Sequence, residues 1–188
     1  MIAVTQDAAK ADAPVIIDVE ASGFGRGSYP IEIGIALACG RTACFLIRPQ
    51  DDWTHWDDDA AALHGLSREL LRAKGRHVTE VAHALNELLE GTTAYTDAWG
   101  MDSSWVALLY DRAELPQRFR IDTLAVLLDE PRRASWATRK REARAEMNLA
   151  RHRASADALV IQRALVRSVG PAVPSPAQAG ALSGASPG

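Results

Sequence analysis

The segment Val15–Gly23 constrains this chain more than any other. Its apolar, largely β-branched residues predict a buried strand, an environment that excludes charge. Asp18 and Glu20 nevertheless stand in it at positions i and i+2, which lie on the same face of a strand. Two like charges this close are costly unless a positive group neutralises them, and a divalent cation, which takes oxygen ligands, would do so. The alternative is a strand end at the protein edge with both carboxylates in water, and the segment alone leaves both interpretations open.

The hydrophobic pattern predicts one domain over residues 14–169. After the first strand, further strands are expected at 31–37, 42–47, 92–96 and 119–121. Helices are expected at 67–74, 79–89, 103–112, 124–128, 135–150 and 155–169. The short link at 38–40 implies an antiparallel hairpin. Three strands followed by strands that alternate with helices indicate an α/β or α+β sheet protein.

The two ends of the chain differ from this domain in composition. Residues 1–13 are expected to form a flexible leader, and the uncharged Pro-, Ala-, Ser- and Gly-rich residues 170–188 a disordered tail. No apolar run is long enough to cross a bilayer and the N-terminus lacks a secretion signal, so we expect a cytoplasmic protein that does not act at a membrane. Cys39 and Cys44 are too few for a disulfide framework or a metal site, and we expect both to be small buried residues.

Charge is unevenly distributed along the chain. The net charge of −3 argues against a generally basic protein that coats DNA. Between Arg132 and Arg153, however, eight Lys and Arg residues stand against Glu142 and Glu146. Such asymmetry is a weak indication of a polyanionic partner, and a solvated helix face is the favoured alternative.

Carboxylates recur at two later helix starts. Asp102 lies between the strand at 92–96 and the following helix, where helix capping by itself explains it. In the segment His152–Asp157, Ser155 is a suitable N-cap, and Asp157 falls in a first turn that favours a carboxylate. A single histidine before a helix is usually a surface residue.

The order of these motifs resembles the DEDDh 3′–5′ exonucleases, which include bacterial proofreading exonuclease subunits, ribonuclease T and oligoribonuclease. The resemblance rests on Asp-x-Glu in a first strand, Asp at the start of a middle helix, and His-x-Ala-x-x-Asp opening the last helix. It covers roughly residues 14–169. The segments Pro30–Gly34 and Leu63–Ser67 are also familiar in this family. Each motif is weak alone, whereas the ordered combination is specific.

The resemblance implies an α/β, ribonuclease H-like fold with a five-stranded mixed sheet whose second strand runs antiparallel, flanked by helices. It implies a catalytic set of four metal-binding carboxylates and a general base: Asp18, Glu20, Asp102, Asp157 and His152. The family's middle motif usually has a His-Asn pair ahead of its Asp. Here Asp97 and Ala98 stand at those positions, so Asp97 remains an alternative to Asp102, which we prefer for its spacing to the following helix.

The implied activity is metal-dependent removal of nucleoside monophosphates from the 3′ end of single-stranded DNA or RNA. Two Mg²⁺ or Mn²⁺ ions would activate the attacking water and stabilise the leaving 3′-oxygen. The backbone at Ala21, Ser22 and Gly23 is expected to lie against the terminal nucleotide. Phe24 or Leu66 would pack on the last base and His64 would touch the sugar or phosphate, although core or loop packing explains these side chains equally well. The cations Arg139, Lys140, Arg141 and Arg144 would guide the strand.

Two other functions fit the same fold. A binding module would hold nucleic acid or a protein without cutting it, and loss of an acidic ligand would be its sign. A phosphodiesterase specific for dinucleotides or small oligonucleotides would use the same site. The sequence leaves open the choice of DNA or RNA, service to a polymerase, and pairing into a homodimer, which some relatives show.

Overall fold

The computed structural model describes residues 13–149 and 152–169. The expected leader up to residue 12 and the expected tail from residue 170 lie outside the described residues. A single sheet has the strand order β3-β2-β1-β4-β5. Its strands are β1 (Val15–Ala21), β2 (Pro30–Ala36), β3 (Thr42–Leu46), β4 (Thr93–Thr96) and β5 (Arg120–Thr123).

The strand directions confirm the predicted mixed sheet. β2 pairs antiparallel with both β1 and β3, whereas β1 with β4 and β4 with β5 pair parallel. The hairpin between β2 and β3 closes where the Leu37 N–H donates to the Arg41 carbonyl at 2.8 Å. Because β1 and β4 are parallel, their carboxyl ends meet at one edge, where sites in α/β sheets usually form.

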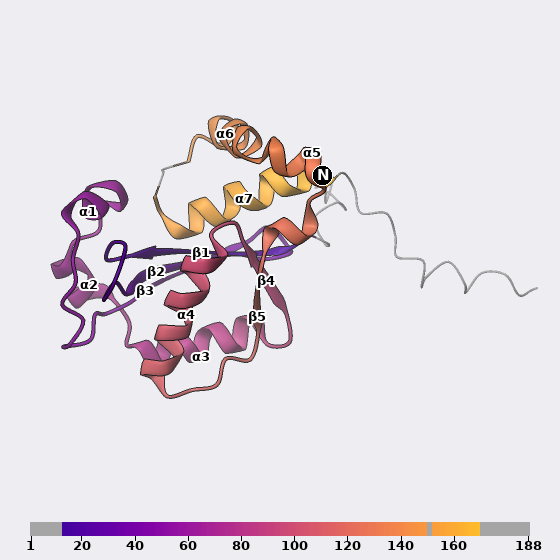
Figure 1. The fold of residues 1–188 in the computed structure, drawn as a ribbon. Coiled ribbons are helices and arrows are strands. Elements are labelled where there is room, and N and C mark those ends of the chain that lie inside the picture. Colours follow the sequence, from indigo (N-terminus) through magenta and orange to yellow (C-terminus); the bar gives the residue numbers. More distant parts are fainter. Residues whose placement is uncertain (1–12, 150–151, 170–188) are drawn as a thin grey trace, which may run out of the picture.

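Helices cover both faces of the sheet (Figure 1). α7 (Ala154–Val169) lies on one face with α6 (Trp136–Met147) packed outside it, and α3 (Val78–Leu89) and α4 (Trp99–Ala113) lie on the other. β1 divides its side chains between the two layers: Ile16 packs with α7, whereas Ile17 joins the larger core with α3 and α4. The same alternation turns the side chains of Asp18 and Glu20 to the α7 face.

The described residues also form shorter helices: α1 (Asp58–His64), α2 (Arg68–Lys74), the 3₁₀ helix η2 (Leu124–Leu127) and α5 (Glu130–Ala134). Asp57 caps α1, and its backbone N–H donates to the Ser22 carbonyl at 2.8 Å. This bond ties α1 to the chain just after β1. Ser67 caps α2, as the sequence predicts.

Three local expectations need correction. α4 begins at Trp99, before the predicted start, so Asp102 lies in its first turn and not at its N-cap. The predicted helix at 124–128 is a short 3₁₀ turn. The expected burial of both cysteines is wrong: Cys39 and Cys44 are exposed, because one lies at the hairpin turn and the other on the edge strand β3. Among the helices of the described residues, none has the length and apolarity needed to cross a membrane.

Candidate active site

The site is built on β1 beneath the first turn of α7. In the β1–β2 register, Asp18 pairs with Gly34 and Glu20 with Glu32. A side chain at Gly34 has no room, because a Cβ there would lie 2.0 Å from the Ala154 carbonyl carbon. The glycine therefore lets the start of α7 approach β2 closely, which brings α7 over the β1 carboxylates.

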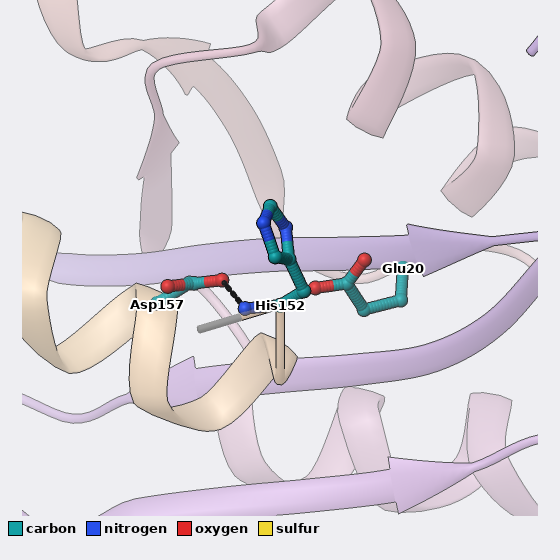
Figure 2. Close-up of side chains that lie close together, drawn as sticks. All are labelled: Glu20, His152 and Asp157. Carbon is teal, nitrogen blue, oxygen red and sulfur yellow. Dashed lines mark hydrogen bonds between the residues drawn. The ribbon is translucent and has the colours of Figure 1, made fainter. Parts of the chain in front are cut away.

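A pocket of about 250 Å³ opens at this place. Its lining includes every residue of the expected catalytic set: Asp18, Glu20, Asp102, His152 and Asp157. They come from β1, from the first turn of α4, and from α7 with the residues just before it. Figure 2 shows Glu20 and Asp157 on either side of His152. The structure therefore gathers side chains that are far apart in the sequence.

Asp102 is the middle carboxylate that reaches the pocket. It is 2% exposed, and the Thr96 hydroxyl donates a hydrogen bond to it. Burial raises the pKa of Asp102 to about 7, with the Thr96 bond acting against this and the charge of Asp97 adding to it. Asp97 is held differently, because it accepts hydrogen bonds from Trp136 Nε1 at 3.1 Å and from Lys140 Nζ.

The two β1 carboxylates are also poorly neutralised. Burial raises the pKa of Asp18 well above its ordinary value, and the charges of Asp102, Asp157, Glu20 and Asp97 raise it further. Burial likewise raises the pKa of Glu20 to about 7, with Asp157 as the next cause. Clustered acids with raised pKa values are typical of catalytic sites and of sites that await a cation.

Asp157 organises the approach to α7. One carboxylate oxygen accepts the backbone N–H of His152 at 2.9 Å, and the other is paired with Arg144 of α6. His152 itself has a left-handed backbone, with φ of 56°. Ligand atoms of Glu20, His152 and Asp157 lie within 4.8 Å of one another, close enough to hold one metal ion.

The expected substrate contacts divide into two groups. Ala21, Gly23, Phe24 and His64 line the pocket. Ser22 is buried in the loop beyond β1, where its hydroxyl accepts the Tyr29 N–H at 3.1 Å. The remaining residue, Leu66, is part of the apolar core and borders a separate hollow beside α2.

His64 is 5% exposed and has one unused polar atom. Its Nδ1 accepts the Leu66 N–H at 3.0 Å, and its buried Nε2 has no hydrogen-bond partner among the described residues. Burial lowers the pKa of His64, which favours the neutral ring. A neutral ring that accepts at Nδ1 carries its proton on Nε2, so it offers a donor.

Sequence reasoning missed the apolar rim of the pocket. Leu63, Met101 and Trp105 line it, and the Trp105 ring lies 6.2 Å from that of Phe24. Phe24 is 68% exposed, which is unusual for a large apolar side chain. The sequence did hold a signal for this rim. Met101 and Trp105 stand close to Asp102 near the start of the same helix, so they could have been expected to border the same site.

Comparison of the sequence with family models and with curated proteins finds no match. The fold, in contrast, resembles solved structures of exonuclease I. The E. coli exonuclease I complex with a dA16 oligonucleotide has a TM-score of 0.62 and 17% identity, over 81% of this chain and 40% of that chain. The zinc-bound E. coli exonuclease I–single-stranded DNA complex has a TM-score of 0.60 at 17% identity and the same coverage.

An apo exonuclease I structure is similar as well, with a TM-score of 0.59 at 13% identity, over 82% of this chain and 42% of that chain. The present chain thus spans about two fifths of the length of these proteins. At such low identity the likeness shows a shared fold, and it agrees with the α/β, ribonuclease H-like architecture expected from the sequence.

Proposed function

We propose that the protein is a metal-dependent nuclease that removes nucleotides from the 3′ end of single-stranded DNA, and that it belongs to the DEDDh exonucleases. The observation that carries the proposal is the gathering of Asp18, Glu20, Asp102 and Asp157 in one pocket beside His152. The fold of exonuclease I, solved with single-stranded oligonucleotides, supports the choice of substrate.

The residues present fit divalent metal ions. The carboxylates supply hard oxygen ligands, and burial together with neighbouring carboxylates raises the pKa values of Asp18, Glu20 and Asp102, a cost that a bound cation would offset. Glu20 and Asp157 would hold one ion, and Asp18 and Asp102 would complete the set. Two Mg²⁺ or Mn²⁺ ions bound there would supply an activated water and stabilise the leaving 3′-oxygen.

His152 is the residue proposed to take the proton from the attacking water. It lines the pocket, and the bond from its backbone N–H to Asp157 fixes the start of α7 beneath it. The imidazole must be neutral when the reaction begins, since only a free ring nitrogen accepts a proton.

The rim of the pocket suits a single strand. Phe24, Leu63 and Met101 present apolar surface on which unpaired bases would stack, whereas a duplex hides its base faces. The small volume suits one terminal nucleotide, and His64, which lines the pocket, stands where it would adjoin the sugar or phosphate. These features favour attack at an end over attack within a strand.

Digestion of end-labelled oligonucleotides tests the proposal. With Mg²⁺ or Mn²⁺, a 5′-labelled single strand should shorten stepwise, and a 3′-labelled one should release labelled mononucleotide at once. EDTA should abolish both reactions. Asp102→Asn should lower the rate about a thousandfold, whereas the surface variant Asp52→Asn should match the wild type.

Other outcomes would replace the proposal. Metal-independent binding of the strand without shortening would indicate a binding module. Cleavage confined to dinucleotides would indicate a small-substrate phosphodiesterase, and faster digestion of RNA than of DNA would change the substrate. If neither DNA nor RNA were shortened with either metal, the enzyme assignment would be wrong.

A further inference from the structure

Glu32 is a buried charge that the proposed mechanism does not use. It lies on β2 with 0% exposure, opposite Glu20 in the β1–β2 register, and its side chain faces α7. A buried carboxylate needs a full set of partners to remain charged. Its partners therefore indicate what it is for.

The partners come mainly from the residues that directly follow His152. Arg153 binds the Glu32 carboxylate with two nitrogens, Nε at 3.1 Å from Oε2 and Nη2 at 2.6 Å from Oε1. The Ala154 backbone N–H donates to Oε2 at 2.9 Å. The Cys44 thiol donates to Oε1 at 3.1 Å. Two consecutive residues at the start of α7 are thus fixed to the sheet by one side chain.

The backbone around His152 is held by two carboxylates, Glu32 and Asp157. The His152 N–H is held by Asp157, one turn into α7, while the next two residues are held by Glu32. The left-handed φ of 56° at His152 is a costly conformation for a residue with a side chain. Such a conformation persists only where the surrounding contacts enforce it, and Glu32 supplies the contacts on the C-terminal side.

We propose that Glu32 is a positioning residue that, through Arg153 and Ala154, sets the location of His152 and Asp157 over the β1 carboxylates. This inference rests on the proposed function for its kinetic consequences only. Glu32 would touch neither substrate nor metal ions, because its side chain is fully buried and is not among those that line the pocket.

The first test measures kinetics on single-stranded DNA with Mn²⁺, well below the melting temperature. Glu32→Gln keeps the shape but loses the charge that attracts Arg153, so kcat should fall about 10- to 100-fold while KM changes less than about twofold. Glu90→Gln, which removes a surface carboxylate paired with Arg118, is the matched control and should leave both constants unchanged. A folded Glu32→Gln protein with wild-type kcat would overturn the inference.

A double-mutant cycle separates positioning from a general loss of stability. If Glu32 acts through Arg153, the double variant with Glu32→Gln and Arg153→Gln should lose no more kcat than the worse single variant. Additive losses would show that the two residues act independently and would contradict the inference.

The second test does not require activity. The chain has five histidines, so histidine ring signals can be followed by NMR, with His152→Asn identifying that of His152. Glu32→Gln should shift or broaden the His152 signal, whereas the signals of His77 and His83 should stay in place. An unchanged His152 signal would refute the positioning role of Glu32, whether or not the protein is a nuclease. If the wild-type protein had no nuclease activity but the His152 signal shifted as expected, the proposed function would fail and the positioning role would stand.

Discussion

Two glutamates that lie opposite each other on neighbouring strands have pKa values shifted in opposite directions. Glu20 on β1 and Glu32 on β2 are register partners. Burial and surrounding acids raise the pKa of Glu20 to about 7. Burial would also raise the pKa of Glu32, but hydrogen bonds from Arg153, Cys44 and Ala154 hold it below its ordinary value.

The difference between the two pKa values shows that the protein neutralises one of these glutamates with its own cation and leaves the other without one among the described residues. Arg153 closes on Glu32 and only weakly offsets the charge of Glu20. One glutamate is thereby made structural, whereas the other stays available to an external cation. Four predictions test this division.

The largest expected effect is on catalysis. Asp18→Asn removes a carboxylate from the uncompensated group, so activity on single-stranded DNA should fall about a thousandfold, equivalent to roughly 4 kcal/mol. The metal-free protein should melt at the same or a higher temperature, because the substitution relieves repulsion among Asp18, Asp102 and Asp157. A clear loss of thermal stability would show that Asp18 is structural.

The next effect is on stability, and it concerns Glu32. Glu32→Ala leaves the buried Ala154 N–H without its partner and removes the carboxylate that holds the half-exposed Arg153 side chain, which should cost about 2–3 kcal/mol of unfolding free energy. Urea denaturation of the metal-free protein measures this cost. Glu90→Ala, at a surface ion pair, should change it by less than about 0.5 kcal/mol.

The third prediction concerns pH and the metal-free protein. Glu20 and Asp102 have pKa values of about 7 when folded, above their ordinary values, so the folded state binds more protons than the unfolded state between about pH 4.5 and 7. Their contribution to stability should therefore decrease as pH rises through this window.

Two comparisons isolate this contribution from those of other groups. Asp102→Asn should show a shallower decline than the wild type over the same window. Saturating Mn²⁺ at pH 7 should restore the lost stability, since the metal favours ionised carboxylates. Parallel curves for wild type and Asp102→Asn would contradict the assignment.

The smallest effect is expected at Cys44. Although the residue as a whole is exposed, desolvation of its sulfur beside Glu32 raises the pKa of the thiol to about 12, with the bond to Glu32 as the next cause, so it remains a neutral donor. Cys44→Ala should cost less than about 1 kcal/mol, because a thiol is a weak donor and Arg153 and Ala154 still hold Glu32. Cys44→Ser should recover much of the loss in the same denaturation assay. A loss as large as that of Glu32→Ala would mean that the thiol is the main partner.

The features that could be predicted from the sequence are those that depend on local patterns of residues. The alternation around Asp18 and Glu20 shows which side chains share a face, and Ser67 marks the start of α2 through its own capping chemistry. The hairpin between β2 and β3 follows from a short link. These features depend on residues close in sequence, where period and turn chemistry decide.

Contacts between distant segments were beyond such patterns. Nothing near Arg144 in the sequence indicates that it pairs with Asp157, nor does the surrounding sequence reveal that Glu32 holds Arg153, 121 positions away. Arg144 and Lys140 were expected to guide a strand, and in the structure both are paired with carboxylates. Such pairings depend on how α6 and α7 pack on the sheet, which the order of elements alone does not determine.

The central place of β1 has a consequence for how the protein fluctuates. β1 pairs with β2 from Ile16 to Ala21, and on its other side it pairs with β4 at Val15 and Ile16. Amides in doubly paired core strands exchange with deuterium mainly through large-scale opening of the domain. Asp18 and Glu20 pair with β2 and follow directly after this doubly paired start of β1, so their spacing should persist through local openings that free the helices around them.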